Sequence, residues 1–191
     1  MLGAEGRGEE AFAEHMRALA LDPLSLIINA GTIHRLYLLR RYAQAADSFG
    51  QALDMDPTFP STHWNLGLVL IQQRDFKRAI EELQTAEELL HGNALVLGGL
   101  GFAYAGSGNK HQARLILRRL ENQARTDYVD PYAFALVYVG LDDKEKALSW
   151  LQRAVEDRDP WVTFAPADPM LDSLRPDPRF HDLLRRMKLA P

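Results

Sequence analysis

Apolar and small residues recur along the chain at one fixed spacing, with polar residues between them. Alanine returns every 34 residues, and the step from Ala45 to Ala79 continues in both directions. Four further series keep the same step without a gap. The five series are Ala11, Ala45, Ala79, Ala113, Ala147; Leu36, Leu70, Tyr104, Tyr138; Phe49, Leu83, Leu117, Leu151; Ala52, Ala86, Leu120, Ala154; and Ile33, Gly67, Gly101, Ala135. Unrelated segments would not hold one register, so the sequence predicts a tandem repeat.

Each repeat is expected to hold two helices joined by a short turn. In the stretch 61–90, apolar residues follow the spacing of an amphipathic helix on both sides of the turn at 73–75. Ser61 is predicted to cap the first helix, and Gly92 suits the left-handed residue that follows the second. A single unit cannot bury its apolar face alone, so stacked units are expected to share one core.

The register divides the chain into a single array over 1–191. We expect an unpaired second helix over 7–25 and a capping segment with two short helices, near 169–174 and 178–187, over 162–191. Between them lie four full units, predicted at 26–59, 60–93, 94–127 and 128–161. The glycine-rich residues 1–7 are expected to be unstructured.

The register resembles the tetratricopeptide repeat family, whose 34-residue unit is a helix–turn–helix. The second unit carries the resemblance through Asn65, Leu66, Gly67, Leu70, Phe76, Ala79, Leu83 and Ala86. The third unit carries it through Leu100, Gly101, Tyr104, Gly108, Ala113 and Leu117. The resemblance implies an all-α fold, a right-handed α-solenoid. The first full unit departs from the pattern, because Ile33 stands where glycine is usual and Thr32 where leucine is.

The C-terminal segment also resembles the end of certain large bacterial proteins. The similar stretches are Asp159-Pro160-Trp161, Leu174-Arg175, Asp177-Pro178-Arg179-Phe180 and Leu183-Leu184-Arg185-Arg186-Met187. In those proteins the repeats follow a winged-helix, kinase or cyclase domain. The resemblance implies an alternative role as the C-terminal regulatory or sensory region of a transcriptional regulator or signalling kinase.

Composition narrows the range of functions. The formal net charge is −4, which argues against a nucleic acid or an anionic membrane as the main target. No cysteine is present, so disulfides and thiolate metal sites are excluded. No apolar stretch reaches the length of a membrane span, and we expect a cytoplasmic protein.

Motifs of catalysis are missing from the sequence. The six histidines are scattered and form no HExxH pair or metal-ligand spacing. The stretch 98–110, GGLGFAYAGSGNK, looks like a phosphate-binding loop, but it has no preceding strand and lies where the repeat requires small residues. We therefore expect no enzymatic activity, no cofactor and no metal.

The family resemblance implies a binding surface on the concave face, lined by the first helix of each unit. The positions carried over are His34, Tyr37, Trp64, Asn65, Leu68, Ile71, Gly98, Phe102, Tyr132 and Leu136. Lysine and arginine are absent from this set, so capture of a C-terminal carboxylate is disfavoured. An aromatic and aliphatic lining suits a helical or extended apolar segment of a partner protein.

Two other interpretations remain open for these residues. Aromatic residues at helical spacing also form ordinary core, and the chain's own C-terminal segment could fill the groove. At the other end, the helix predicted from Arg7 to Leu21 lacks a partner helix and exposes apolar residues such as Phe12 and Met16. Self-association through this uncovered helix is a further expectation.

Overall fold

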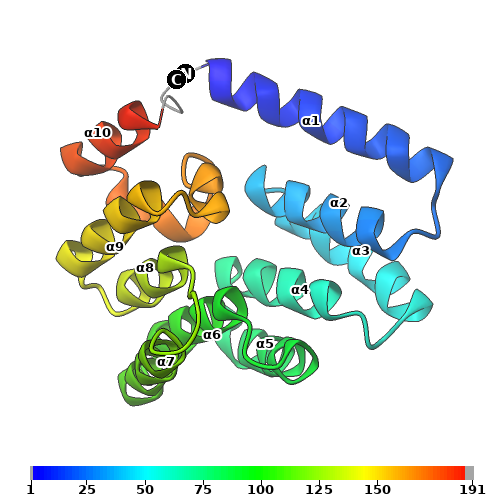
Figure 1. Cartoon of the computed structure of the whole chain (residues 1–191). Coiled ribbons are helices and arrows are strands. Elements are labelled where there is room, and N and C mark those ends of the chain that lie inside the picture. The colour runs from blue at the N-terminus through cyan, green and yellow to red at the C-terminus, as the bar shows by residue number, and fades with distance from the viewer. Residues whose placement is uncertain (1, 188–191) are drawn as a thin grey trace. The chain divides into compact units, whose positions relative to one another are not determined.

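The computed structural model describes residues 2–187, with side chains from Gly8 onward (Figure 1). These residues form helices and turns and no strand, which confirms the predicted all-α class. The chain divides into two compact units, one ending at Leu90 and one beginning at His91. Each unit is a set of helices packed in consecutive pairs.

The first unit contains five helices among its described residues. They are α1 (Leu2–Leu21), α2 (Leu26–Leu38), α3 (Tyr42–Met55), α4 (Pro60–Gln72) and α5 (Phe76–Leu90). Helices α2 and α3 form one pair, α4 and α5 the next, and α2 also packs against α4. Helix α1 covers α2, where His15 Nε2 lies 3.0 Å from the carbonyl oxygen of Ile28.

The second unit repeats this arrangement and adds a C-terminal segment. Its elements are α6 (Ala94–Gly106), α7 (Lys110–Gln123), α8 (Pro131–Gly140), α9 (Lys144–Glu156), two 3₁₀ turns, η1 (Pro160–Phe164) and η2 (Pro169–Leu174), and α10 (Pro178–Arg186). Helix α8 packs against α6, α7 and α9, while η2 packs on α8 and α10 on α9.

Small residues set how closely the paired helices approach. A Cβ added to Gly67 would lie 2.4 Å from Leu83 Cγ, so α4 and α5 are in contact there. At Gly101 the added Cβ would lie 2.6 Å from Val137 Cγ2, across the α6–α8 interface. The predicted alanine series is buried at Ala45, Ala79, Ala113 and Ala147. Alanines 34 residues apart therefore lie in the same kind of buried environment in all four helix pairs.

The turns inside the four pairs share one backbone conformation. Arg40, Arg74, Gly108 and Asp142 all have positive φ, between 60° and 88°, and lie 34 residues apart. In each turn the next residue donates its N–H to a carbonyl five positions earlier, as from Asp75 to Leu70 at 3.0 Å. This pattern closes the C-terminus of each first helix. Only one of the four positions carries glycine, so three turns hold a left-handed residue with a side chain.

Asp-Pro pairs start the elements of the C-terminal segment. Asp159, Asp168 and Asp177 each accept a hydrogen bond from a backbone N–H two residues on, and a proline follows each of them. The predicted helices near 169–174 and 178–187 are confirmed, the first as a 3₁₀ helix, whereas η1 was not predicted. Arg175 holds the segment together by donating to the carbonyl oxygens of Pro166 (2.8 Å) and Asp168 (3.1 Å).

Two local expectations were wrong. Helix α4 begins at Pro60, so Ser61 lies inside the helix and Phe59 occupies the cap position without a side-chain bond. Proline at the first helical position needs no N–H partner, which explains the earlier start. Helix α1 begins at Leu2, not near Arg7, because glycine raises the cost of a helix without forbidding it.

Replacing glycine by alanine should change the free energy of unfolding in opposite directions at Gly108 and at Gly50. Gly108→Ala should lower the free energy of unfolding by about 1 kcal/mol, because alanine is strained at positive φ. Gly50→Ala, in α3 with open space around the added Cβ, should raise it by about 0.5–1 kcal/mol. Urea denaturation of both variants checks this, and equal signs would contradict the assignment.

Candidate functional site

The predicted binding residues of the first unit gather where α2 packs against α4. The ring of His34 stacks on that of Trp64, with centroids 5.5 Å apart and planes 18° apart. On the same helix Tyr37 stacks against His34 at 5.8 Å. Residues 34 and 37 lie one turn apart on α2, so the sequence spacing already placed these two rings on one face.

Asn65 fixes the orientation of this aromatic cluster. Its Nδ2 donates to the carbonyl oxygens of Ala30 (3.1 Å) and Ser61 (2.9 Å), so its Oδ1 is the acceptor. His34 Nδ1 lies 3.0 Å from that oxygen and therefore carries a proton. A buried amide thus links α2 and α4 and sets the tautomer of the histidine.

The six predicted residues of this unit differ in accessibility. Tyr37, Asn65, Leu68 and Ile71 are buried, while His34 and Trp64 keep part of their surface exposed. The four buried residues lie beside two partly buried rings. His34 and Trp64 are therefore the more accessible members of this set, although His34 Nε2 and Trp64 Nε1 are themselves buried.

In the second unit the predicted residues lie on α6 and α8. Phe102 is half-buried, whereas Tyr132 and Leu136 are buried. A Cβ added to Gly140 would lie 2.8 Å from Phe102 Cα, so the two helices are in close contact there. Gly98 likewise faces the backbone of Ala133, which assigns it to helix packing. Phe102 is the accessible member of this set.

The C-terminal segment covers the side chain of Tyr132. The Tyr132 hydroxyl donates to Asp168 Oδ2 at 2.6 Å, and both residues are buried. Burial, followed by the neighbouring Asp168 charge, raises the pKa of Tyr132 well above its usual value. At this end of α8 the chain's own segment covers the predicted face.

Two carboxylates meet at the start of α8. Buried Asp159 accepts hydrogen bonds from the backbone N–H of Tyr132 and of Trp161, each at 2.9 Å. Burial raises the pKa of Asp159, and these two donors oppose the rise. Burial and, secondly, the Asp159 charge raise the pKa of Asp130. The sequence showed the Asp-Pro pattern at 130 and 159 but not that the two carboxylates come together.

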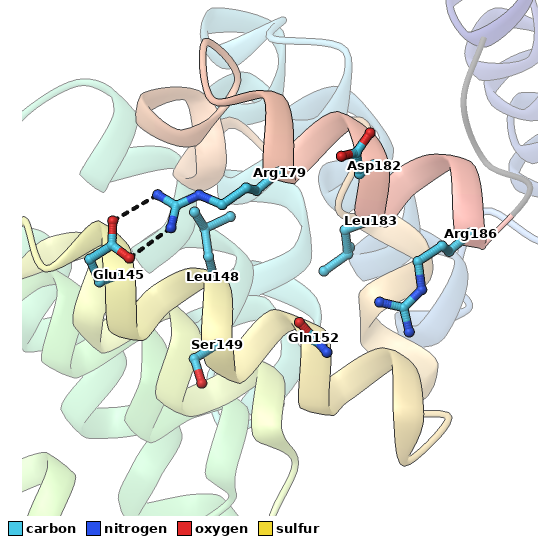
Figure 2. A pocket seen from close by; sticks show the side chains of 8 residues that line it. All are labelled: Glu145, Leu148, Ser149, Gln152, Arg179, Asp182, Leu183 and Arg186. Carbon is cyan, nitrogen blue, oxygen red and sulfur yellow. Dashed lines mark hydrogen bonds and ion pairs between the residues drawn. The ribbon is translucent and has the colours of Figure 1, made fainter.

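A groove between α9 and α10 was missed by sequence reasoning. It is lined by residues of both helices, with Arg179 joined to Glu145 at one end (Figure 2). Both helices are short, charged and amphipathic, and that pattern alone is typical of a solvated face. Only the packing of α10 on α9 creates the groove.

Among the described side chains, from residue 8 to 187, no three His, Asp or Glu come together in a way that could hold a metal ion. None of the helices in this described range is long and apolar enough to cross a bilayer.

Comparison with known protein families gives a match over the repeats. A family model described as tetratricopeptide repeat matches residues 36–90 and again 70–137. Together the matches run from 36 to 137, more than half of the 191 residues. No protein of curated function matches the chain at a significant level.

Replacing Asp130, one of the two carboxylates at the start of α8, should change the free energy of unfolding in a pH-dependent way. Asp130→Asn should raise the free energy of unfolding at pH 7, because ionised Asp130 lies beside Asp159 in a partly buried place. Its pKa in the folded state exceeds the unfolded one, so the penalty exists only above these values. The gain should shrink as pH falls through the folded-state pKa and vanish below the unfolded value of 3.8.

Urea denaturation across this pH range checks the prediction. Asp127→Asn, which removes an exposed carboxylate from the same connecting segment, is the matched control. A gain from Asp130→Asn that stayed constant down to acidic pH would show that burial of the ionised carboxylate beside Asp159 is not its cause.

Proposed function

Because the chain belongs to the tetratricopeptide repeat family, we propose that it is a scaffold that binds a segment of a partner protein on its first helices. Repeats of this family mediate contacts between proteins, and its members are typically scaffolds and not enzymes. The segment we expect is helical or extended, with an apolar face. The observation that carries this proposal is the half-exposed stack of His34 on Trp64.

The cluster has the features of a binding hot spot. Tryptophan supplies a large apolar surface with few rotatable bonds, and such residues dominate interface energies. Asn65 holds the His34 ring in place before a ligand arrives, which reduces the entropy lost on binding. Phe102 gives the second unit one half-exposed ring on its own first helix. The aromatic side chains therefore supply affinity, and the buried polar contact supplies order.

In the second form of this proposal, the bound segment comes from the same polypeptide. The resemblance of the C-terminal segment to that of bacterial regulators and kinases supports it. The repeats would then regulate another domain by holding part of it. Both forms use the same aromatic side chains and differ in the source of the segment.

Loss of the aromatic rings should abolish partner binding while the fold persists. We expect Trp64→Ala and Phe102→Ala to weaken binding of a recovered partner by about 30-fold each, as for hot-spot residues. The measurement is affinity capture with identification of the partner, followed by calorimetric titration of each variant. Circular dichroism must first show that the variants retain their helices.

Tyr128→Ala is the matched control, because Tyr128 is a 64 % exposed aromatic residue outside the first helices. It should leave the affinity unchanged. Equal recovery of every partner by the wild-type chain and by both aromatic variants would remove the first helices from consideration.

We also propose that two copies associate through the region around the α1–α2 turn of the first unit. Large apolar side chains are exposed around the turn between α1 and α2, at Met16 (41 %), Leu21 (88 %), Leu24 (75 %) and Ile27 (76 %). Such a cluster is rarely left open to water. A two-fold contact would bury the same face of each copy, the commonest arrangement of homodimers.

Ile27→Glu should convert the dimer into a monomer, because each interface would then bury two unpaired carboxylates. Sedimentation velocity over a concentration series measures this. Leu90→Glu, at a 38 % exposed position at the end of α5, is the control and should remain dimeric. A wild-type chain that sediments as a monomer at high concentration would contradict the proposal.

A further inference from the structure

The second unit carries a groove that is separate from the first helices of the repeats. It lies between α9 and α10 and encloses about 390 Å³. Its floor is apolar, because Leu148 and Leu183 point into it from the two helices and are themselves buried (Figure 2). Its rim is polar and is formed by Glu145, Ser149, Gln152, Arg179, Asp182 and Arg186. A ligand here would meet hydrocarbon below and hydrogen-bonding groups at the sides.

One end of the groove is closed by a saturated ion pair. Arg179 donates from both terminal nitrogens to Glu145 at 2.7 Å, and from Nε and Nη2 to Asp177 at 3.0 and 2.8 Å. These contacts lower the pKa of Asp177 to about 2. They tie the start of α10 to the start of α9. Arg179 therefore holds the two helices together, and each of its guanidinium nitrogens already donates a hydrogen bond to Glu145 or Asp177.

At the other end of the groove, Arg186 makes fewer and longer contacts than Arg179. Its Nη2 is 3.9 Å from Glu156 Oε1, beyond hydrogen-bond distance, and Gln152 already donates to that oxygen at 2.9 Å. Among the side chains that the structure describes, from residue 8 to 187, Arg186 makes this long ion pair but no side-chain hydrogen bond, and its side chain is 55 % exposed. Its guanidinium can donate two hydrogen bonds to a carboxylate without breaking a hydrogen bond that it already makes.

The positive charges of the two helices are mostly paired. Helix α9 carries three Lys or Arg against two Glu, and α10 carries three Arg against one Asp. Aspartates at the helix ends offset this excess, because Asp143, Asp157 and Asp177 lie against Lys146, Arg153 and Arg179. Arg186 is thus the cation of the groove lining that is left for an acidic ligand.

We propose that the α9–α10 groove binds a short acidic segment of a partner protein. An aliphatic side chain of that segment lies on Leu148 and Leu183, and a carboxylate one or two residues away pairs with Arg186. Ser149 and Gln152 border the path of its backbone. A nucleic acid fits less well, because phosphates would leave the apolar floor without a partner. The proposal does not depend on binding at His34 and Trp64.

The test uses the full chain and a fluorescein-labelled peptide of alternating leucine and glutamate, followed by fluorescence anisotropy. Arg186→Gln should weaken binding about tenfold or more, the loss expected for a charge-assisted pair. Lys144→Gln removes the same charge from the start of α9, at an exposed position outside the groove lining, and should change the affinity less than about twofold. Ser149→Trp, at an exposed rim position, should block the peptide by filling the groove.

Control peptides complete the design. Replacing glutamate by lysine, or leucine by serine, should abolish binding, because each removes one half of the recognition. Equal losses from Lys144→Gln and Arg186→Gln would overturn the proposal in favour of unspecific attraction to a basic surface. Absence of binding by the leucine–glutamate peptide, or tighter binding of a single-stranded oligonucleotide, would also overturn it.

Discussion

Close contact between helix backbones is the constraint on which this molecule depends. Where α4 meets α5, a single added carbon on Gly67 would lie 2.4 Å from Leu83, so the pair could not close with a larger residue. At Gly98 the neighbour is backbone: an added Cβ would lie 3.0 Å from the Cα and carbonyl oxygen of Ala133. Side chains can move aside but backbones cannot, so the contact between α6 and α8 tolerates the least change. Each large apolar residue then fills space whose width the small residues have set.

The contact requires an abrupt turn between the two helices of a pair. Each turn uses one left-handed residue and one hydrogen bond back to the preceding helix, as at Gly108 and Asn109. Three of the second helices then start at a side-chain cap, Asp75, Asn109 or Asp143, whereas α3 begins after Arg41 without one. Arg41 pairs instead with Glu9 of α1 at 2.7 Å. In the α2–α3 pair, an ion pair with α1 thus stands where the other pairs have a side-chain cap.

The C-terminal segment ends the second unit by satisfying groups that would otherwise face solvent or remain unpaired. Asp159 takes the first N–H of α8 that needs an acceptor, and Asp168 takes the hydroxyl of Tyr132. Having closed α8, the segment places α10 against α9 and thereby creates the groove between these two helices. Closure of the repeat and formation of the groove are consequences of the same short segment. Binding on the first helices and binding on α10 can therefore involve different partners.

The sequence by itself determined the helical class, the 34-residue register and most helix boundaries. It could do so because these depend on local spacing: Ala45 and Ala79 share an environment since each unit repeats the same packing. The family resemblance also assigned His34 and Trp64 to the same face of the first helices, and the structure adds that their rings stack.

Only the tertiary structure decided which of the predicted binding residues can be reached. Tyr132 is buried by Asp168, which lies outside the periodic part of the chain, so no register relates the two. The sequence analysis assigned the C-terminal segment only a capping role, and the contact of α10 with α9 is what sets Arg186 beside an apolar floor. Exposure and charge at a site depend on what packs beside it, and that information is absent from local sequence.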